Sequence, residues 1–215
     1  METELVLVGF EIRGNLRFLS HAELFRLFQR ACIRAGINMS YSHGFNPRPQ
    51  LSLPLPKSVG LELDNDLLCL NVLDDRGHID CEALGNKLAA QLPQGCRLLS
   101  VAVSQAKTVH PQKAVYLFAP LPEYLNDELK STIKRLMQSE NLNLDRQIDD
   151  IGNIRNVNVR PFLEGIEIDD KNIKVGCRIS GNGSIRVDEI LKLLNLDMDK
   201  LASPIKRTNI QWRQT

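Results

Sequence analysis

The order of secondary-structure patterns along the first hundred residues is the feature that most constrains the fold of this chain. An apolar stretch at 5–14 predicts a strand, and Ser20 with Glu23 forms a capping-box pattern that predicts the start of a helix over 21–35. Two strands, a helix and a last strand are then predicted over 50–55, 67–73, 81–92 and 96–104. This β-α-β-β-α-β order is typical of a ferredoxin-like unit.

The same order recurs more weakly in the second half, after a linker at 105–113. The patterns of strand, helix, two strands, helix and strand cover 114–121, 126–138, 156–168, 172–180, 187–196 and 205–212. Residues 139–155 fit this order least well and are expected to hold a long loop. The sequence therefore predicts an α+β protein of two ferredoxin-like (βαββαβ) units packed together, with domains at 1–105 and 106–215.

The composition is that of a folded soluble protein, with 43% apolar and 25% charged residues. No apolar run approaches the roughly 18–20 residues that cross a bilayer, and the N-terminus lacks the basic region of a secretory signal. We therefore expect a cytoplasmic protein with no membrane partner. The five cysteines are widely spaced and odd in number, so we expect buried thiols and predict neither a metal site nor a cofactor.

The net charge of +1 hides a strong local asymmetry. Between Ile12 and Lys57 only Glu23 is acidic, whereas seven residues are basic. These are Arg13, Arg17, Arg26, Arg30, Arg34, Arg48 and Lys57. A chain polarised in this way favours a local surface that binds an anionic partner.

Three arginines repeat at intervals of four residues along the predicted helix. Arg26, Arg30 and Arg34 therefore form one stripe beside the apolar face, where their like charges repel unless an anion lies over them. The planar guanidinium suits phosphate, so the stripe predicts an RNA or phosphate-binding surface. A solvated helix face with no ligand is the alternative.

The stretch "YSHGFNPRPQLSLPLP" at 41–56 combines rings, cations and prolines. Tyr41, His43 and Phe45 offer faces for stacking on unpaired bases, and Asn46 and Arg48 add polar contacts. The prolines restrict the loop and so reduce the entropy lost on binding. The alternative is a loop that packs its rings onto the sheet as a small core. We expect the arginine helix and this loop to meet in one pocket for an anionic ligand that carries rings.

Two histidines are weak candidates for catalysis. His21 follows the helix cap, where the helix dipole favours the neutral imidazole, and His43 lies in the loop. No carboxylate, nucleophile or third ligand stands near them at a recognisable spacing. Structural histidines are the favoured interpretation, and a ribonuclease-like pair assisted by Arg17 is the alternative.

Residues 17–62 carry motifs that resemble a known family, the radical-SAM-linked domain of unknown function DUF2344. The matching motifs are "RFLSH" from Arg17, Arg30, the "AG" pair at 35–36, "YS" at 41–42, "GFNP" at 44–47, Pro49, and "LS" at 51–52. Arg207, in "IKRTNIQW", matches the closing strand of the family. Departures are Glu23, where aspartate is common, and the run Arg48, Pro49 and Gln50, where the family often has histidine, proline and a basic residue.

The resemblance implies a partner in RNA metabolism, because members are fused to, or encoded beside, radical-SAM proteins and also lie near RNA-processing and ribosomal genes. We expect an RNA-binding accessory rather than an enzyme, presenting an RNA substrate to a radical-SAM partner, with no DNA partner. The expected contacts are made by Arg17, Arg26, Arg30, Arg34, Tyr41, Phe45, Asn46 and Arg48. The alternatives are a metal-independent RNA nuclease or RNA-modifying enzyme that uses His21 and His43, and a protein–protein scaffold.

Overall fold

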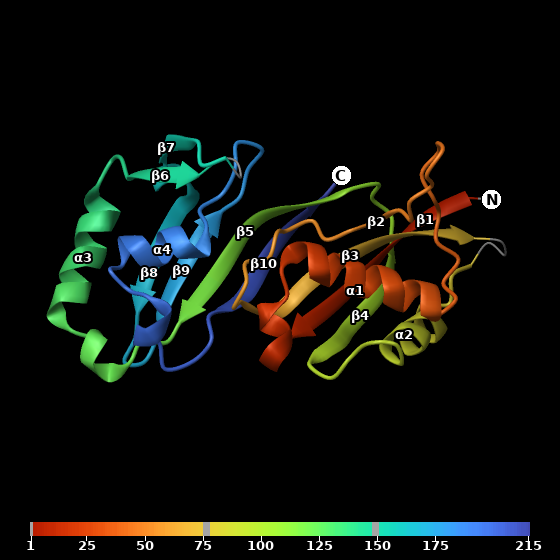
Figure 1. Cartoon of the computed structure of the whole chain (residues 1–215), viewed down its shortest axis with the longest axis horizontal. Coiled ribbons are helices and arrows are strands. Elements are labelled where there is room, and N and C mark those ends of the chain that lie inside the picture. Colours follow the sequence, from red (N-terminus) through yellow and green to blue (C-terminus); the bar gives the residue numbers. More distant parts are fainter. Residues whose placement is uncertain (1, 75–77, 148–150) are drawn as a thin grey trace. The chain divides into compact units, whose positions relative to one another are not determined.

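The protein is an α+β protein whose chain divides into two compact units. The structure, a computed structural model, describes residues 2–74, 78–147 and 151–215, which contain four α-helices and mainly antiparallel strands (Figure 1). Unit 1 consists of Met1–Pro111 and Trp212–Thr215, and unit 2 consists of Gln112–Gln211.

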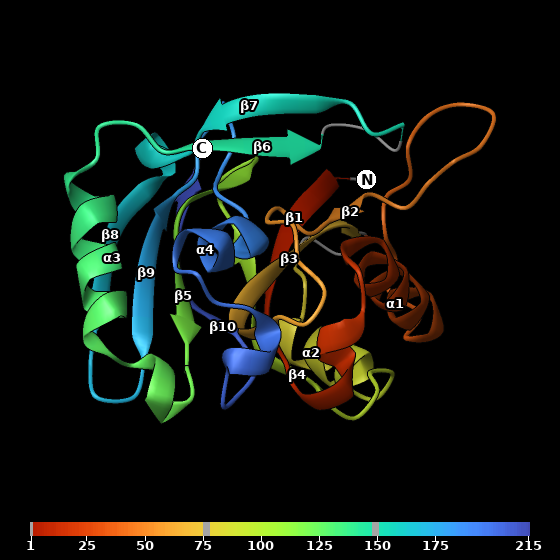
Figure 2. The ribbon, with the colours of Figure 1, turned by 60° about the vertical axis from the view of Figure 1, so that its left-hand side comes forward.

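Unit 1 contains the β-α-β-β-α-β order predicted for the first hundred residues. Its elements are β1 (Glu2–Ile12), the 3-10 helix η1 (Gly14–Phe18), α1 (His21–Arg34), β2 (Leu51–Ser52), β3 (Glu62–Asp74), α2 (Cys81–Ala89) and β4 (Cys96–Ser104). The strands lie in the order β4-β1-β3-β2, and each neighbouring pair is antiparallel. Helices α1 and α2 cover the same face of this sheet (Figures 1 and 2).

The core of unit 1 lies between that sheet face and the two helices. Alternate β1 side chains, among them Val8 and Phe10, are fully buried, because successive residues of a strand point to opposite faces. The Phe10 ring meets the Phe28 ring of α1 edge to face, with centroids 4.6 Å apart. The predicted apolar face of α1 is confirmed at four positions, whereas Leu27 is only half-buried.

Both ends of α1 have the predicted caps. The Ser20 N–H donates to the Glu23 carboxylate at 2.8 Å, and the Glu23 N–H donates to the Ser20 hydroxyl at 3.3 Å. Gly36 follows the helix with φ +64°, a left-handed conformation that glycine adopts without strain. The helix therefore ends one residue earlier than predicted.

Two strands of unit 1 differ in length from the prediction. β3 begins at Glu62 and not at 67. Its first five residues, ELDND, are mostly polar and so give no apolar pattern in the sequence, although they extend the pairing with β1. β2 spans only Leu51–Ser52. The prolines that follow it lack an N–H donor and so end the strand early.

Unit 2 repeats the order of unit 1 with a hairpin inserted. Its strands are β5 (Val109–Phe118), β6 (Asn143–Gln147), β7 (Ile154–Asn158), β8 (Leu163–Ile168), β9 (Ile173–Arg178) and β10 (Lys206–Gln214). Its helices are α3 (Asp127–Gln138) and α4 (Val187–Leu193), with the 3-10 helices η2 (Pro122–Tyr124), η3 (Arg160–Phe162) and η4 (Met198–Lys200). The part of β5 that belongs to unit 2 begins at Gln112, and the part of β10 that belongs to it ends at Gln211. The strands lie in the order β10-β5-β9-β8. The β6–β7 hairpin forms a separate two-stranded sheet.

Two predictions for 139–168 are wrong. The region expected to be a long loop contains β6 and the start of β7, and the single strand expected over 156–168 is two strands separated by η3. Pro161 lies inside η3 and has no backbone N–H for a ladder. The Arg160 guanidinium donates to the carbonyls of Ser139, Leu163 and Met137, which holds this turn in place.

Candidate anion-binding groove

The arginine stripe of α1 lines one wall of an open groove of about 620 Å³. Arg26, Arg30 and Arg34 are all exposed. They lie one helical turn apart, about 6 Å along the axis, as the 1.5 Å rise of an α-helix requires. The other lining residues are Leu19, Glu23, Leu27, Ala90, Gln91, Leu92 and Pro93. The groove therefore runs between α1 and the turn that follows α2.

The positive charge of this groove is largely uncompensated. Among the described residues, neither Arg26 nor Arg30 forms a salt bridge with a carboxylate. Arg34 is oriented by neutral groups, because its guanidinium donates to the Gln91 side chain at 3.2 Å and to the Gln91 carbonyl at 2.8 Å. Three guanidinium groups thus face a groove that holds a single carboxylate, that of Glu23.

Glu23 marks the end of the groove at the N-terminus of α1. Hydrogen bonds from the Ser20 backbone and hydroxyl lower the pKa of Glu23, and the positive charge of Arg26 lowers it further. The carboxylate is therefore ionised at neutral pH and repels an anion at this end. The stretch from Arg26 to Arg34 is the part of the groove whose charged side chains are all cations.

The wall opposite the stripe was not predicted from the sequence. Ala90, Leu92 and Pro93 contribute apolar surface, and Gln91 contributes the carbonyl that orients Arg34. Nothing near these residues in the sequence signals a site, since they lie more than fifty positions from the arginines they face. Only the packing of α1 beside α2 brings them together.

The other basic residues of the predicted patch have different environments. Arg13 forms ion pairs with Glu11 and Asp64. The Arg17 guanidinium lies over the Phe18 ring, 4.3 Å from its centroid, and donates to the Gly14 carbonyl, so Arg17 lines no part of the groove. Lys57 is 5% exposed.

Lys57 binds the segment that precedes the N-terminus of α1. Its ammonium donates to the carbonyls of Arg17, Leu19 and Ser58 at 2.6, 2.7 and 3.1 Å. A buried charge satisfied in this way holds the segment that enters α1. Arg207 of β10, the residue matched by the family resemblance, is 1% exposed and is likewise not part of a surface.

The proline-rich stretch forms a projecting loop, which we call the finger (residues 41–49). Tyr41 and Pro49 form an isolated antiparallel bridge. The Ser42 N–H donates to the Arg48 carbonyl at 2.8 Å, and the Arg48 N–H donates to the Ser42 hydroxyl at 3.0 Å. These bonds close the base of the finger, which rises away from α1 in Figures 1 and 2.

The tip of the finger presents its side chains to solvent. Phe45 is fully exposed, Tyr41 is 47% exposed, and His43, Asn46 and Arg48 are also exposed. A Cβ placed on Gly44, whose φ is +136°, would meet no neighbour within 4 Å. The alternative in which these rings pack onto the sheet as a small core is therefore wrong for Phe45.

The structure does not bring the finger and the arginine stripe into one pocket, because no finger residue lines the groove. The physical reason is the register of the segment that leads into the finger. Met39 pairs with Val72 near the end of β3, and the Ser40 N–H donates to the Asn71 carbonyl. The finger thus leaves from the β3 edge, whereas the stripe faces the turn after α2.

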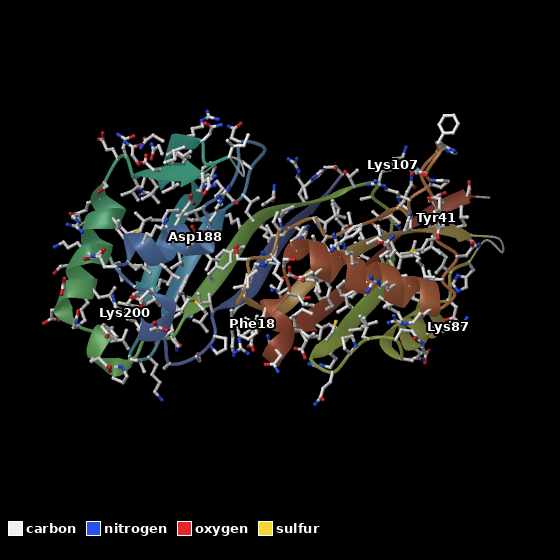
Figure 3. All side chains as sticks on the ribbon, in the orientation of Figure 1. Phe18, Tyr41, Lys87, Lys107, Asp188 and Lys200 are labelled. Carbon is white, nitrogen blue, oxygen red and sulfur yellow. The ribbon has the colours of Figure 1, made fainter. Side chains whose placement is uncertain are left out.

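The two candidate catalytic histidines are also far apart. His21 is the first residue of α1, and His43 lies in the finger, beyond the other end of that helix. Fourteen helical residues span about 20 Å. In Figure 3, Phe18, which precedes α1, and Tyr41, at the base of the finger, lie at opposite ends of that helix. A single phosphate cannot contact both imidazoles at this distance, so we do not propose the paired-histidine nuclease.

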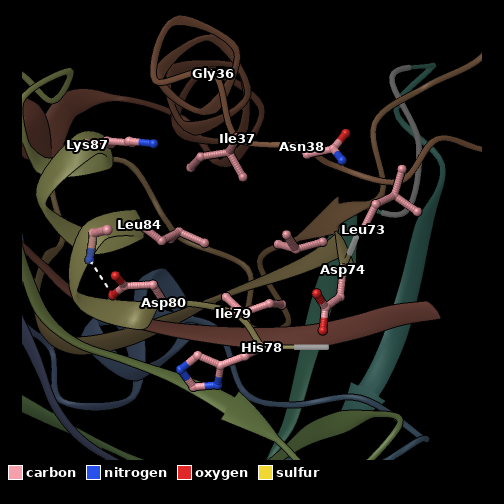
Figure 4. Close-up of a pocket in the computed structure, with 12 residues that line it drawn as sticks. Gly36, Ile37, Asn38, Leu73, Asp74, His78, Ile79, Asp80, Leu84 and Lys87 are labelled. Atoms are coloured by element: carbon pink, nitrogen blue, oxygen red, sulfur yellow. Dashed lines mark hydrogen bonds between the residues drawn. The ribbon is translucent and has the colours of Figure 1, made fainter. Parts of the chain in front are cut away.

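A second hollow of about 320 Å³ lies where the end of α1 meets the start of α2. Its side chains Ile37, Ile79 and Leu84 point toward one another across the cavity (Figure 4). Asp80 at its rim accepts the Ala83 N–H at 2.9 Å and so serves as the N-cap of α2. The hollow is mainly aliphatic, and the groups on its rim do not converge on a ligand position.

The cysteines are buried as predicted, except Cys81, which is half-buried. Burial raises the pKa of Cys32, Cys96 and Cys177 to about 12 and that of Cys69 to about 11, so these thiols stay protonated. Within the described part of the chain, no three His, Cys, Asp or Glu side chains cluster closely enough to hold a metal ion. No described helix has the length and apolarity that crossing a membrane requires.

Comparison with known families identifies the class of this protein. Residues 6–192 match the family described as "Uncharacterized protein conserved in bacteria (DUF2344)". The chain therefore belongs to the DUF2344 family, and the predicted resemblance is confirmed at that level. The description of the family names no activity and no partner.

More distant comparisons add no functional argument. No curated protein matches the chain. The acetolactate synthase small subunit of Thermotoga maritima aligns over 100% of this chain and 98% of its own, with 12% identity and a TM-score of 0.29. An unknown protein from Galdieria sulphuraria aligns over 100% and 99%, with 9% identity and a TM-score of 0.30. Similarity this low supports no inference about function.

Proposed function

We propose that this protein binds RNA and acts as an accessory that presents an RNA substrate to a radical-SAM enzyme. The proposal of RNA binding rests on the row of Arg26, Arg30 and Arg34, which lines a groove that contains one carboxylate. Like charges one turn apart destabilise a helix unless an anion offsets their repulsion. A groove with this charge therefore favours a phosphate-bearing ligand.

The finger supplies the second part of the proposed RNA surface. Tyr41 and Phe45 offer exposed ring faces to unpaired bases, while Asn46 and Arg48 offer polar contacts beside them. The bonds at the base of the finger restrict it before binding, which lowers the entropy lost when a base stacks. The groove then binds backbone phosphates and the finger binds bases at a separate place.

The radical-SAM partner and a cytoplasmic location rest on the family resemblance and on the composition of the chain. We also propose that the two compact units are two ferredoxin-like domains, close to the predicted division at 1–105 and 106–215. The support is that β1-α1-β2-β3-α2-β4 and β5-α3-β8-β9-α4-β10 follow the same order along the chain. Their strands also follow equivalent lateral orders, β4-β1-β3-β2 and β10-β5-β9-β8.

Crosslinking to total cellular RNA tests the proposal. The variant Arg26→Glu/Arg30→Glu reverses two charges in the groove, and we expect RNA recovery to fall at least about tenfold. The matched control is Lys134→Glu/Arg135→Glu, which makes the same charge change on exposed positions of α3 and should retain recovery near that of the wild type.

Equal recovery from the groove variant and the wild type would reject RNA binding by the groove. The protein–protein scaffold would then be the better candidate, because the fully exposed Phe45 suits insertion into an apolar pocket of another protein. Recovery that falls equally in the groove variant and the α3 control would show only a general effect of net charge, and it would also reject the proposed site.

A further inference from the structure

We infer that the groove binds one RNA strand through three consecutive phosphates, one at each of Arg26, Arg30 and Arg34. This inference rests on the proposed function and specifies the substrate as a single-stranded segment. It concerns the groove alone and requires no contact with the finger.

The spacing of the stripe supports a contiguous strand. The three arginines repeat at about 6 Å along the helix axis. Consecutive phosphates of a stacked, A-type strand lie a similar distance apart, and each guanidinium fork fits one phosphate with two parallel hydrogen bonds. DNA strands with the more extended sugar pucker space their phosphates more widely and fit this row less well.

The size and walls of the groove support a single strand over a duplex. A volume of about 620 Å³ lies within the range of about 300–1,000 Å³ found for ligand sites and holds a short segment. The apolar wall of Ala90, Leu92 and Pro93 stands opposite the arginines, where it suits ribose and base faces. Unpaired bases expose their faces to such a wall, whereas a duplex keeps its base faces inside the stack.

The ends of the groove define the length of the bound segment. On the N-terminal side of the stripe, Glu23 contributes a negative charge that disfavours a further phosphate. At the other end Arg34 is already oriented by Gln91, which reduces the ordering that binding requires. Between these ends there is one guanidinium for each of three phosphates.

Fluorescence anisotropy with the full-length protein tests this inference. The probes are labelled oligouridylates in a length series, a hairpin duplex of RNA, and a DNA strand of equal length. We expect affinity to rise with length until the strand carries three phosphates, with the duplex and the DNA strand binding at least about tenfold more weakly. For the shortest strand that binds fully, the logarithm of affinity should fall with the logarithm of salt with a slope of about −2.

Single variants test two of the three proposed contacts. Arg26→Gln and Arg30→Gln should each weaken binding about tenfold and reduce the steepness of the salt dependence by about 0.7. Lys87→Gln is the control, since it removes an exposed cation of unit 1 that does not line the groove. Circular dichroism checks that each variant keeps its helix content.

The outcomes distinguish failure of the three-phosphate inference from failure of the proposed RNA binding. Equal affinity for strand and duplex, equal affinity for RNA and DNA, or an unchanged salt slope in both arginine variants would overturn the three-phosphate inference while RNA binding stands. Failure of every RNA probe to bind, together with unchanged crosslinking in the groove variant, would overturn the proposed function itself.

Discussion

At the scale of single residues, the positions of basic groups show that charge in the sequence is not charge on the surface. Lys57 and Arg30 count equally in the local excess of basic residues. Lys57 is buried with its ammonium donating to three carbonyls, whereas Arg30 lines an open groove. Replacing Lys57 would remove its ammonium from all three carbonyls and leave the Arg17 carbonyl with only the Gly60 N–H at 2.8 Å, so the expected effect is on stability.

Glu23 gives a prediction about pH at the same scale. Its pKa is lowered from an ordinary value of 4.5, first by the backbone hydrogen bond of Ser20 and then by the Ser20 hydroxyl. The stabilisation is therefore complete above 4.5 and is lost as the pH falls through the lower value of the folded state. We expect Glu23→Gln to be less stable than the wild type at neutral pH and equally stable at a pH well below 4.5.

Urea unfolding followed by circular dichroism at the two pH values measures this effect. Glu82→Gln is the control, because Glu82 lies in the first turn of α2 without a capping box. A stability difference between Glu23→Gln and the wild type that persists unchanged into acid would show that the charge of Glu23 is not the cause.

At the scale of elements, a buried ion pair holds the β6–β7 hairpin in unit 2. The Arg146 guanidinium donates to both oxygens of Glu189 at 2.7 Å and to the Ser184 carbonyl at 3.0 Å. The Glu189 carboxylate also accepts the Arg186 N–H at 2.8 Å at the start of α4. The side chains are 14% and 4% exposed, so the pair joins the hairpin to α4 away from solvent.

Removal of one partner of this pair should be strongly destabilising. We expect Glu189→Ala to lower the free energy of unfolding by about 3 kcal/mol, because Arg146 remains buried without its counter-charge. Glu164→Ala is the matched control, since it removes the more exposed pair with Lys113 and should cost less than about 1 kcal/mol. Urea titration of both variants measures the difference, and equal losses would contradict the role assigned to the buried pair.

At the scale of the whole molecule, the reactivity of the cysteine thiols can report on the unfolding of each of the two units. Cys32, Cys69 and Cys96 lie in the core of unit 1, and Cys177 lies in the core of unit 2. Their raised pKa values and burial protect them from thiol reagents until the unit around them unfolds. The half-buried Cys81 remains accessible.

Thiol labelling with peptide mapping across a urea series therefore reports on each unit. We expect Cys81 to react in the folded protein, the three unit 1 thiols to share one urea midpoint, and Cys177 to have a different one. Total labelling in concentrated urea is the control for reagent access. A single midpoint for all four buried thiols would show that the two units unfold as one cooperative body.

The sequence by itself determined the local features of this protein. The capping box at Ser20, the glycine at 36, the apolar face of α1 and the order of elements in unit 1 all follow from neighbours within about one helical turn or from strand alternation. The hairpin at β6–β7 escaped prediction because its strands are largely exposed and lack an apolar pattern.

Only the tertiary structure decided which of these features act together. The groove requires Gln91 and Pro93 to stand opposite arginines that are distant in sequence, and the finger leaves from the β3 edge instead of joining them. Whether a cation is buried or exposed depends on carbonyls supplied by remote segments, as at Lys57. Local patterns specify helices and strands, whereas long-range packing sets which charged side chains reach solvent.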